Sequence, residues 1–287
     1  MRFLHCSDVH ITQDYAATPL RALGWRRTLA LFELKFGGRS NSFAVAGKTL
    51  RRIAEASLAE DHLILSGDLT AYAMDAEFAG AQQALAAVVH RKQRCTIIPG
   101  NHDRYTPRAL SQHRFEKYFG ALLESDLPEY VAEDGFPFVR LLGDRDAVIG
   151  LCSARVPALP GFSFGFIGRA QLGALARLVQ DPRLAGRAVL VAVHHAPFKA
   201  DGTPDKPLHG LRDAAELLAL LPGPRFAVLH GHIHHRFHHP ATPTRPHVFG
   251  AGSSTQKGRE GFWVIETRDG AILKAEKRPV PETSSPE

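Results

Sequence analysis

Short apolar segments alternate with longer segments of helical periodicity along the chain. The short segments are rich in β-branched or large apolar residues and end beside a polar residue or a glycine; they lie at residues 3–6, 63–65, 96–98, 189–193 and 226–229. Runs of this length and composition predict buried strands. Apolar residues recur at helical spacing over residues 43–58, 76–89, 169–178 and 211–221, with Ser42, Asp75 and Gly168 as the expected start positions.

Strands and helices that alternate in this way predict sheets covered by helices. In such folds, functional side chains gather in the loops that follow the carboxyl ends of strands. Further apolar segments at residues 138–142, 148–152, 248–249, 262–266 and 272–276 predict more strands, with a hairpin turn at Asp269-Gly270. We expect these additional strands to form a second, more antiparallel sheet.

The composition is that of an ordered globular protein, since 44% of the 287 residues are hydrophobic and 22% are charged. We expect one domain over residues 1–278 and a disordered polar tail over residues 279–287. Residues 19–40 mix basic and apolar side chains and are expected to form an insertion or lid. No apolar run reaches the roughly 20 residues that span a bilayer, and the N-terminus lacks the pattern of a signal peptide, so a cytoplasmic location is expected.

The positions of the cysteines and the net charge of the chain lead to two further expectations. Cys6, Cys95 and Cys152 each lie within an apolar segment, which predicts buried, reduced thiols. The formal net charge of +6 suits a phosphate-bearing ligand, but the basic residues are spread along the chain, so no nucleic-acid partner is required. Histidine is the unusual residue: the chain has 16, and six of them lie between His230 and His239.

Side chains able to bind metals follow each of the five strands predicted first. They are Asp8 and His10, then Asp68, then Asn101 with His102 and Asp103, then His194, and finally His232 with His234. A glycine directly precedes three of these groups and would let ions approach the backbone. Each motif taken alone is also explained by turn residues or surface histidines. Their occurrence at five strand ends of one chain favours a single metal centre over loose metal storage by a histidine-rich segment.

The ordered pattern Asp-x-His, Gly-Asp, Gly-Asn-His-Asp, His, Gly-His-x-His, complete between Asp8 and His234, resembles that of the calcineurin-like metallophosphoesterases. The resemblance implies an α/β fold in which a two-sheet β-sandwich of mixed strands is flanked by helices. It also implies a dinuclear metal centre in which a hydroxide shared by the two ions attacks phosphorus. The ligands implied are Asp8, His10 and His234 for one ion and Asn101, His194 and His232 for the other, with Asp68 bridging both.

The resemblance also gives roles to the residues after Asn101. His102 matches the family's non-ligand histidine, which is placed to protonate the leaving alkoxide, and Asp103 is expected to orient the His102 ring. Because His194 and His195 are adjacent, either could be the ligand, and we choose His194 as the first residue after the strand. Mixed nitrogen and oxygen ligands favour two divalent or trivalent transition-metal ions, such as Mn, Fe, Zn or Co, over calcium.

For the substrate, the chain resembles the branch of the family that contains the bacterial class III cyclic-nucleotide phosphodiesterases. A cyclic nucleotide or a similar small phosphodiester is therefore expected. One alternative is a lipid-linked, nucleotide-sugar pyrophosphatase that contacts a membrane peripherally through residues 19–40, although the lipid A pyrophosphatases have Arg where this chain has His102. Two rival functions are DNA end processing and a non-catalytic metal-binding scaffold. The sequence predicts no oligomeric state.

Overall fold

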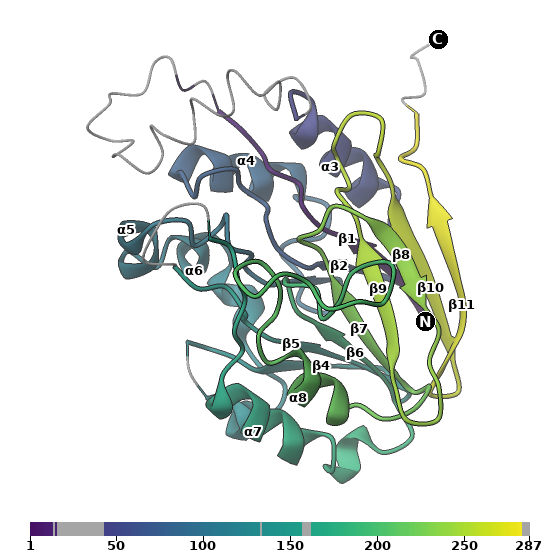
Figure 1. The fold of residues 1–287 in the computed structure, drawn as a ribbon. Coiled ribbons are helices and arrows are strands. Elements are labelled where there is room, and N and C mark those ends of the chain that lie inside the picture. Colours follow the sequence, from purple (N-terminus) through teal and green to yellow (C-terminus); the bar gives the residue numbers. More distant parts are fainter. Residues whose placement is uncertain (14, 16–42, 133, 157–161, 283–287) are drawn as a thin grey trace.

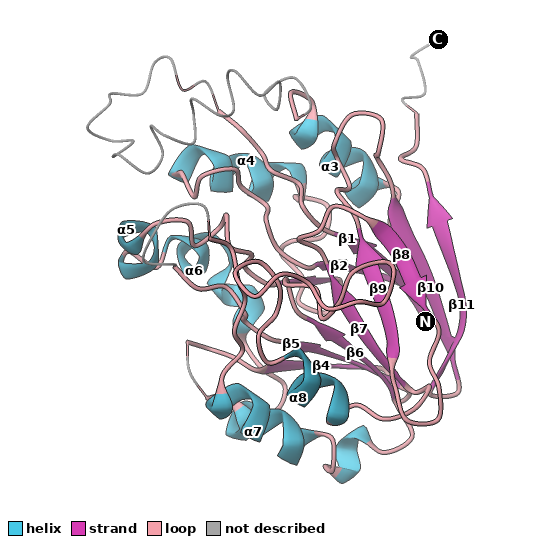
Figure 2. Cartoon of the chain, in the orientation of Figure 1, coloured by secondary structure: helices cyan, strands magenta, loops and turns pink. Residues whose placement is uncertain are grey.

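The computed structural model describes residues 1–13, 15, 43–132, 134–156 and 162–282. Two β-sheets pack face to face, and helices cover the outer face of each sheet (Figure 1). The fold class expected from the sequence is therefore confirmed (Figure 2). The lid predicted at residues 19–40 and the expected helix start at Ser42 lie outside the described residues, as does most of the polar tail.

The five-stranded sheet has the order β11-β10-β1-β2-β3. Its strands are β1 (Arg2–Cys6), β2 (Asp61–Leu65), β3 (Cys95–Ile97), β10 (Phe262–Arg268) and β11 (Ala271–Arg278). β1, β2 and β3 are parallel, whereas β10 runs antiparallel to β1 and forms a hairpin with β11. The carboxyl ends of β1, β2 and β3 therefore meet at one edge of the sheet.

The six-stranded sheet has the order β4-β5-β6-β7-β9-β8. Its strands are β4 (Phe138–Leu142), β5 (Asp146–Gly150), β6 (Ala188–Ala192), β7 (Phe226–His230), β8 (Arg236–His239) and β9 (His247–Ala251). β5, β6, β7 and β9 are parallel, and the edge strands β4 and β8 are antiparallel to their neighbours. Our expectation of a separate, more antiparallel sheet is wrong, because the additional strands extend both sheets at their edges.

Helices α3 (Ala46–Glu55), α4 (Asp75–Ala84), α5 (Pro107–Ser111) and α6 (Arg114–Phe119) cover the five-stranded sheet, and α7 (Arg169–Leu178) and α8 (Ala214–Ala219) cover the other. Short 3₁₀ helices lie at Gly120–Leu123, Pro128–Tyr130 and Pro182–Leu184. α7 has the predicted bounds and follows Gly168, whose φ of 92° suits glycine. α4 begins at Asp75, and its Glu77 carboxylate accepts from the Met74 backbone N–H.

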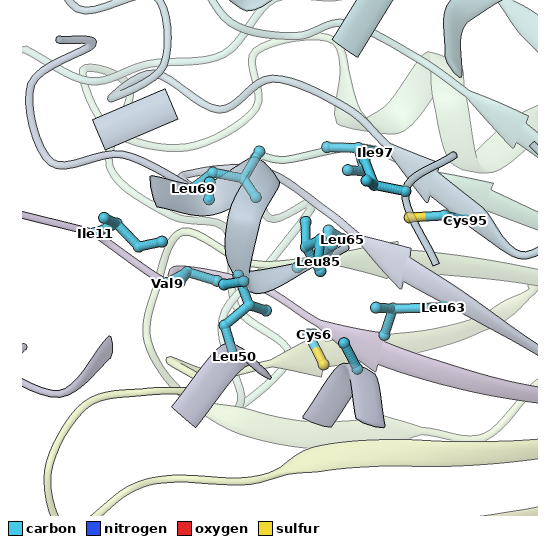
Figure 3. Close-up of a cluster of buried hydrophobic side chains, with 14 of the residues drawn as sticks. Cys6, Val9, Ile11, Leu50, Leu63, Leu65, Leu69, Leu85, Cys95 and Ile97 are labelled. Atoms are coloured by element: carbon cyan, nitrogen blue, oxygen red, sulfur yellow. The ribbon is translucent and has the colours of Figure 1, made fainter. Parts of the chain in front are cut away.

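Three apolar layers hold these elements together: one between the two sheets, and one between each sheet and the helices that cover it. One lies between the sheets and includes Phe3, Phe138 and Phe249. A second lies between the five-stranded sheet and its helices, where Cys6 and Cys95 pack among aliphatic side chains such as Leu50 (Figure 3). All three cysteines are free and buried, as expected, and burial raises the pKa of the Cys6 and Cys95 thiols to about 12. Within the described part of the chain, no helix is long and apolar enough to cross a membrane.

Candidate metal centre

The seven predicted ligands meet where the strand ends of both sheets come together. Asp8 and His10 follow β1, Asp68 follows β2 and Asn101 follows β3, all in the five-stranded sheet. His194 follows β6, and His232 and His234 follow β7, in the six-stranded sheet. Parallel strands place their carboxyl ends at the same edge, so residues more than 200 positions apart in sequence become neighbours.

Asp8, His10 and His234 form one group of donor atoms that lie within 4.8 Å of one another. The Nε2 atoms of His10 and His234 are 3.1 Å apart, and His234 Nε2 is 3.3 Å from Asp8 Oδ1. His10 Nε2 lies 3.9 Å from the same Asp8 oxygen. Two imidazole nitrogens and one carboxylate oxygen thus face a common point, a donor set that suits a transition-metal ion.

Asn101, His194 and His232 form a second group. Asn101 Oδ1 lies 3.1 Å from His194 Nε2 and 3.1 Å from His232 Nδ1. The Asp68 carboxylate lies between the two groups, because its Oδ2 is 3.4 Å from His194 Nε2 and 3.9 Å from His10 Nε2. This geometry matches the expected bridging position, while the ligand roles themselves stay predictions.

Backbone carbonyls hold the second ring nitrogen of both histidines in this group. His194 Nδ1 donates to the carbonyl of Ser66 at 2.8 Å, and His232 Nε2 donates to the carbonyl of His209 at 3.0 Å. Histidines that bind metals are oriented in this way, with one N–H fixed and the other nitrogen left as a ligand. The available nitrogens are His194 Nε2 and His232 Nδ1, the two atoms that face Asn101.

Charge also fits a cation at this place. Asp8 and Asp68 are almost completely buried, and the ion-pair partners of both carboxylates among the described residues are imidazoles. Burial alone would raise the pKa of Asp68, but the surrounding His194, His102 and His10 hold it well below its usual range. Burial lowers the pKa of His10 to about 3, so that ring is neutral. Burial opposes a charge on His194, but the Asp68 carboxylate raises the pKa of this ring to about 9, so a bound cation would take the place of its proton beside the buried carboxylates.

The backbone is strained at this centre. Nine non-glycine residues of the described chain have positive φ, and five of these are predicted ligands: Asp8 (52°), His10 (52°), Asp68 (55°), His232 (71°) and His234 (49°). Such conformations cost about 1–3 kcal/mol each for ordinary side chains and concentrate at functional sites. The strained turn after β1 brings Asp8 and His10 to the first group of donors, and the strained turn after β7 directs His234 to the first group and His232 to the second.

Glycine lets two of the loops approach each other. A Cβ atom on Gly100 would lie 2.1 Å from Asp68 Oδ1, and one on Gly231 would lie 2.3 Å from Asp8 Oδ2 and 1.9 Å from Ser7 Oγ. No side chain fits at these distances. The glycines in the Gly-Asn and Gly-His motifs are therefore required by close packing against the carboxylates.

His102 lies beside the first group of donors. Its backbone N–H donates to Asp68 Oδ1 at 2.8 Å, and its ring centroid is 4.8 Å from that of His10. Its Nδ1 donates to the carbonyl of Ala71 at 2.6 Å, which leaves Nε2 as the ring atom available to a substrate. This position is compatible with the proton-donor role predicted from the sequence.

Asp103 has a different partner from the one expected. Its carboxylate accepts hydrogen bonds from the backbone N–H groups of Leu69, Thr70 and Gly100 and from the Thr70 hydroxyl. The prediction that Asp103 orients the His102 ring is wrong, because the Ala71 carbonyl does so. Asp103 instead ties the loop after β2 to the loop after β3. Burial, together with the nearby Asp68 carboxylate, raises the pKa of Asp103 to about 6.

Of the two adjacent histidines, His194 reaches Asp68 and Asn101. The Nδ1 atom of His195 lies 2.8 Å from the Ser153 hydroxyl, and the ring is completely buried. His195 can also be grouped with His194 and His232 as a set of donor atoms within 4.8 Å. The contacts to a carboxylate and an amide favour His194 as the ligand.

Two hydroxyl residues that no sequence motif singles out support the loop after β1. The Ser253 hydroxyl donates to the Asp8 carbonyl at 2.7 Å, and the Thr255 hydroxyl donates to the Val9 carbonyl at 2.6 Å. Both residues follow β9, which is parallel to β7 and therefore ends at the same edge. Their position directly after a predicted strand could have indicated a role at the centre. Hydroxyl residues after a strand are, however, also ordinary turn residues, so the sequence alone does not distinguish them.

A two-sheet α/β fold whose strand ends carry two groups of carboxylate, amide and imidazole donors defines the class of dinuclear metallophosphoesterases. The family model described as calcineurin-like phosphoesterase matches residues 1–236, and the chain belongs to this family. The resemblance inferred from the motifs is thus confirmed. Members of the family use two transition-metal ions, and this chain has the donor groups that fit them.

Solved structures agree on the fold. A dimetal phosphatase from Danio rerio shares 12% identity with a TM-score of 0.54, over 98% of this chain and 99% of that one. A purple acid phosphatase from yellow lupin (Lupinus luteus) shares 11% identity with a TM-score of 0.59, over 97% of this chain and 51% of that one, so this chain spans about half its length. No curated protein matches the sequence.

Proposed function

We propose that the protein hydrolyses small phosphodiesters, cyclic nucleotides among them, at a centre of two transition-metal ions. The observation that carries this proposal is the convergence of Asp68 with the two donor groups, while His102 Nε2 remains available beside them. Two ions held there polarise a phosphoryl group and lower the pKa of a water molecule. Asp8, His10 and His234 would hold one ion, Asn101, His194 and His232 the other, and Asp68 both.

The chain itself supplies orientation and a proton. His102 keeps its Nδ1–H on the Ala71 carbonyl, so a proton on Nε2 can pass to the leaving oxygen as the bond from phosphorus to that oxygen breaks. The hydrogen bond from the His102 backbone N–H to Asp68 fixes the position of His102 relative to the predicted metal ligands. Asp103 keeps both loops in register through their backbone N–H groups.

The test measures hydrolysis of bis(p-nitrophenyl) phosphate, p-nitrophenyl phosphate, and 2′,3′- and 3′,5′-cyclic AMP by metal-stripped protein reloaded with manganese. We expect metal-dependent turnover of diesters, its loss in Asn101→Ala, and unchanged turnover in His90→Ala, a control at an exposed histidine that precedes the amino end of β3, opposite the carboxyl ends that form the centre. Faster turnover of the monoester would contradict the diester preference. No turnover with any metal would favour a lipid-linked substrate or a non-catalytic scaffold.

A further inference from the structure

A pocket adjoins the candidate metal centre on the side of His232 and His234. Its volume is about 430 Å³, which lies in the range of small-molecule sites. Besides the two predicted ligands, Lys199, Asp205 and His209 line it, and all three come from the loop between β6 and α8. The pocket therefore offers room for a part of the substrate beyond the phosphoryl group.

His209 is fixed in this pocket by three contacts. Its Nδ1 donates to Asp205 Oδ2 at 2.6 Å, and its backbone carbonyl accepts the bond from His232 Nε2. Its ring centroid lies 4.1 Å from that of His232. The bond to Asp205 leaves Nε2 as the ring atom available to a ligand. Asp205 is the one carboxylate among the described lining residues, and its side chain is only 8% exposed.

Lys199 is held at the same rim by a tight turn. Its backbone N–H donates to the Thr203 carbonyl at 2.9 Å, and its carbonyl accepts from Gly202 N–H at 2.8 Å. The turn is anchored to β8, because His239 Nε2 donates to the Ala200 carbonyl at 3.1 Å. The Lys199 ammonium is 3.7 Å from Asp201 Oδ2, and both side chains are largely exposed. Such exposed pairs are weak, so the ammonium remains available to a ligand.

We propose that Lys199 and His209 bind a second anionic group of the substrate, a phosphate or a carboxylate, next to the phosphoryl group at the metal centre. The inference deepens the proposed phosphoesterase function and rests on it. Besides the predicted ligands, the pocket offers the Lys199 ammonium and the imidazoles of His209 and His235, while Asp205, the one carboxylate among its described lining residues, is already hydrogen-bonded to His209. An anion placed there gains charge-assisted hydrogen bonds without facing a free carboxylate.

The experiment compares three phosphonates, whose P–C bonds are not hydrolysed, by calorimetric titration of the manganese-loaded protein. Ethylphosphonate carries one anionic group, phosphonoacetate adds a carboxylate, and ethylenebisphosphonate adds a second phosphonate. We expect one of the last two to bind at least about tenfold more tightly than ethylphosphonate, as one charge-assisted hydrogen bond predicts. Which of them binds more tightly identifies the second group.

Lys199→Gln and His209→Gln should each remove most of this preference, and Lys199→Gln, whose side chain does not contact a predicted ligand, should leave ethylphosphonate binding and the metal content unchanged. Lys206→Gln is the matched control, because Lys206 is exposed on the same loop and does not line this pocket. The proposal would be overturned if the wild type bound all three phosphonates equally, or if the preference survived in both variants. It would also be overturned if the variants lost ethylphosphonate binding as strongly as they lost binding of the other two. Because phosphonate binding is measured without turnover, the result tests the anion site whether or not the diesters named above are substrates.

Discussion

Single atoms decide the shape of the candidate metal centre. The carboxylate oxygens of Asp8 and Asp68 lie where the Cβ atoms of Gly231 and Gly100 would be. The strained φ values of the neighbouring ligands leave these loops little freedom to move apart. Small changes at glycine should therefore affect metal binding before they affect the rest of the fold.

Gly231→Ala tests this directly. The new methyl group would meet Ser7 Oγ at 1.9 Å and Asp8 Oδ2 at 2.3 Å, so Ser7 and the Asp8 carboxylate must both shift from their present positions. We expect metal affinity to fall at least about tenfold, as seen when the support of metal ligands is disturbed. Metal content after dialysis measures the effect. Gly173→Ala is the control, since nothing lies within 4 Å of a Cβ at that helical position; equal metal content in the two variants would contradict the argument.

His102→Ala tests the proton donor. Substrates with a good leaving group, such as p-nitrophenolate, need little help from an acid, whereas alkoxide leaving groups need a proton. We expect turnover of bis(p-nitrophenyl) phosphate to fall only several-fold and turnover of an alkyl phosphodiester to fall by about 10²–10⁴. The ratio of the two rates is the measurement. An equal loss for both substrates would show that His102 acts in another way.

At the scale of elements, hydrophobic periodicity and the flanking polar and glycine residues predicted the central strands well. β1, β2, β3, β6 and β7 lie within one or two residues of their predicted bounds, and α7 matches its bounds. β8, α5 and α6 were missed. β8 consists of Arg236-Phe237-His238-His239, which has little strand propensity and is held by pairing with β9. α5 and α6 are too short for helical periodicity to emerge from the sequence.

β2 contains a buried titratable side chain away from the metal centre. His62 donates from Nδ1 to the Gln93 carbonyl at 2.7 Å and pairs through Nε2 with the Thr96 hydroxyl at 2.8 Å. Burial lowers its pKa from 6.5 to about 4. The unfolded chain therefore binds a proton that the folded chain excludes between these pH values. The stability contributed by neutral His62 is complete above pH 6.5 and is lost as the pH falls toward 4.

We expect the free energy of unfolding of His62→Gln to depend less steeply on pH than that of the wild type. The two slopes should differ by about 1.4 kcal/mol per pH unit in this window. Urea unfolding of both metal-free proteins between pH 4 and 7 measures the difference. Other buried histidines contribute equally to both proteins and cancel. Parallel curves would mean that His62 is not the group responsible.

At the scale of the whole molecule, the candidate centre joins the two sheets. Asp8, His10, Asp68 and Asn101 belong to one sheet, and His194, His232 and His234 belong to the other. The order of the motifs predicted that these residues meet at one centre, but not which strands share a sheet. Strand partners are set by contacts distant in sequence, such as β1 with β10, and local patterns do not encode them.

Removal of metal should therefore weaken the contact between the sheets. Ions that bind only the folded protein stabilise it by about 4 kcal/mol at a free concentration of 1,000 Kd. We expect thermal unfolding in excess manganese to occur several degrees above that in chelator. Asn101→Ala should show a much smaller difference, and an equal shift in both proteins would indicate binding elsewhere.

The position of β1 has a consequence for how the protein is made. β1 lies between β2 and β10, so during synthesis it waits for Phe262–Arg268 before both of its neighbours in the sheet are present. Asp8 and His10 are translated more than 200 residues before His232 and His234. For most of its synthesis, the nascent chain thus carries Asp8 and His10 without His234, the third donor of their group. We therefore expect metal acquisition to be a late step of biogenesis, since a chain interrupted before residue 232 would hold neither group of donors complete.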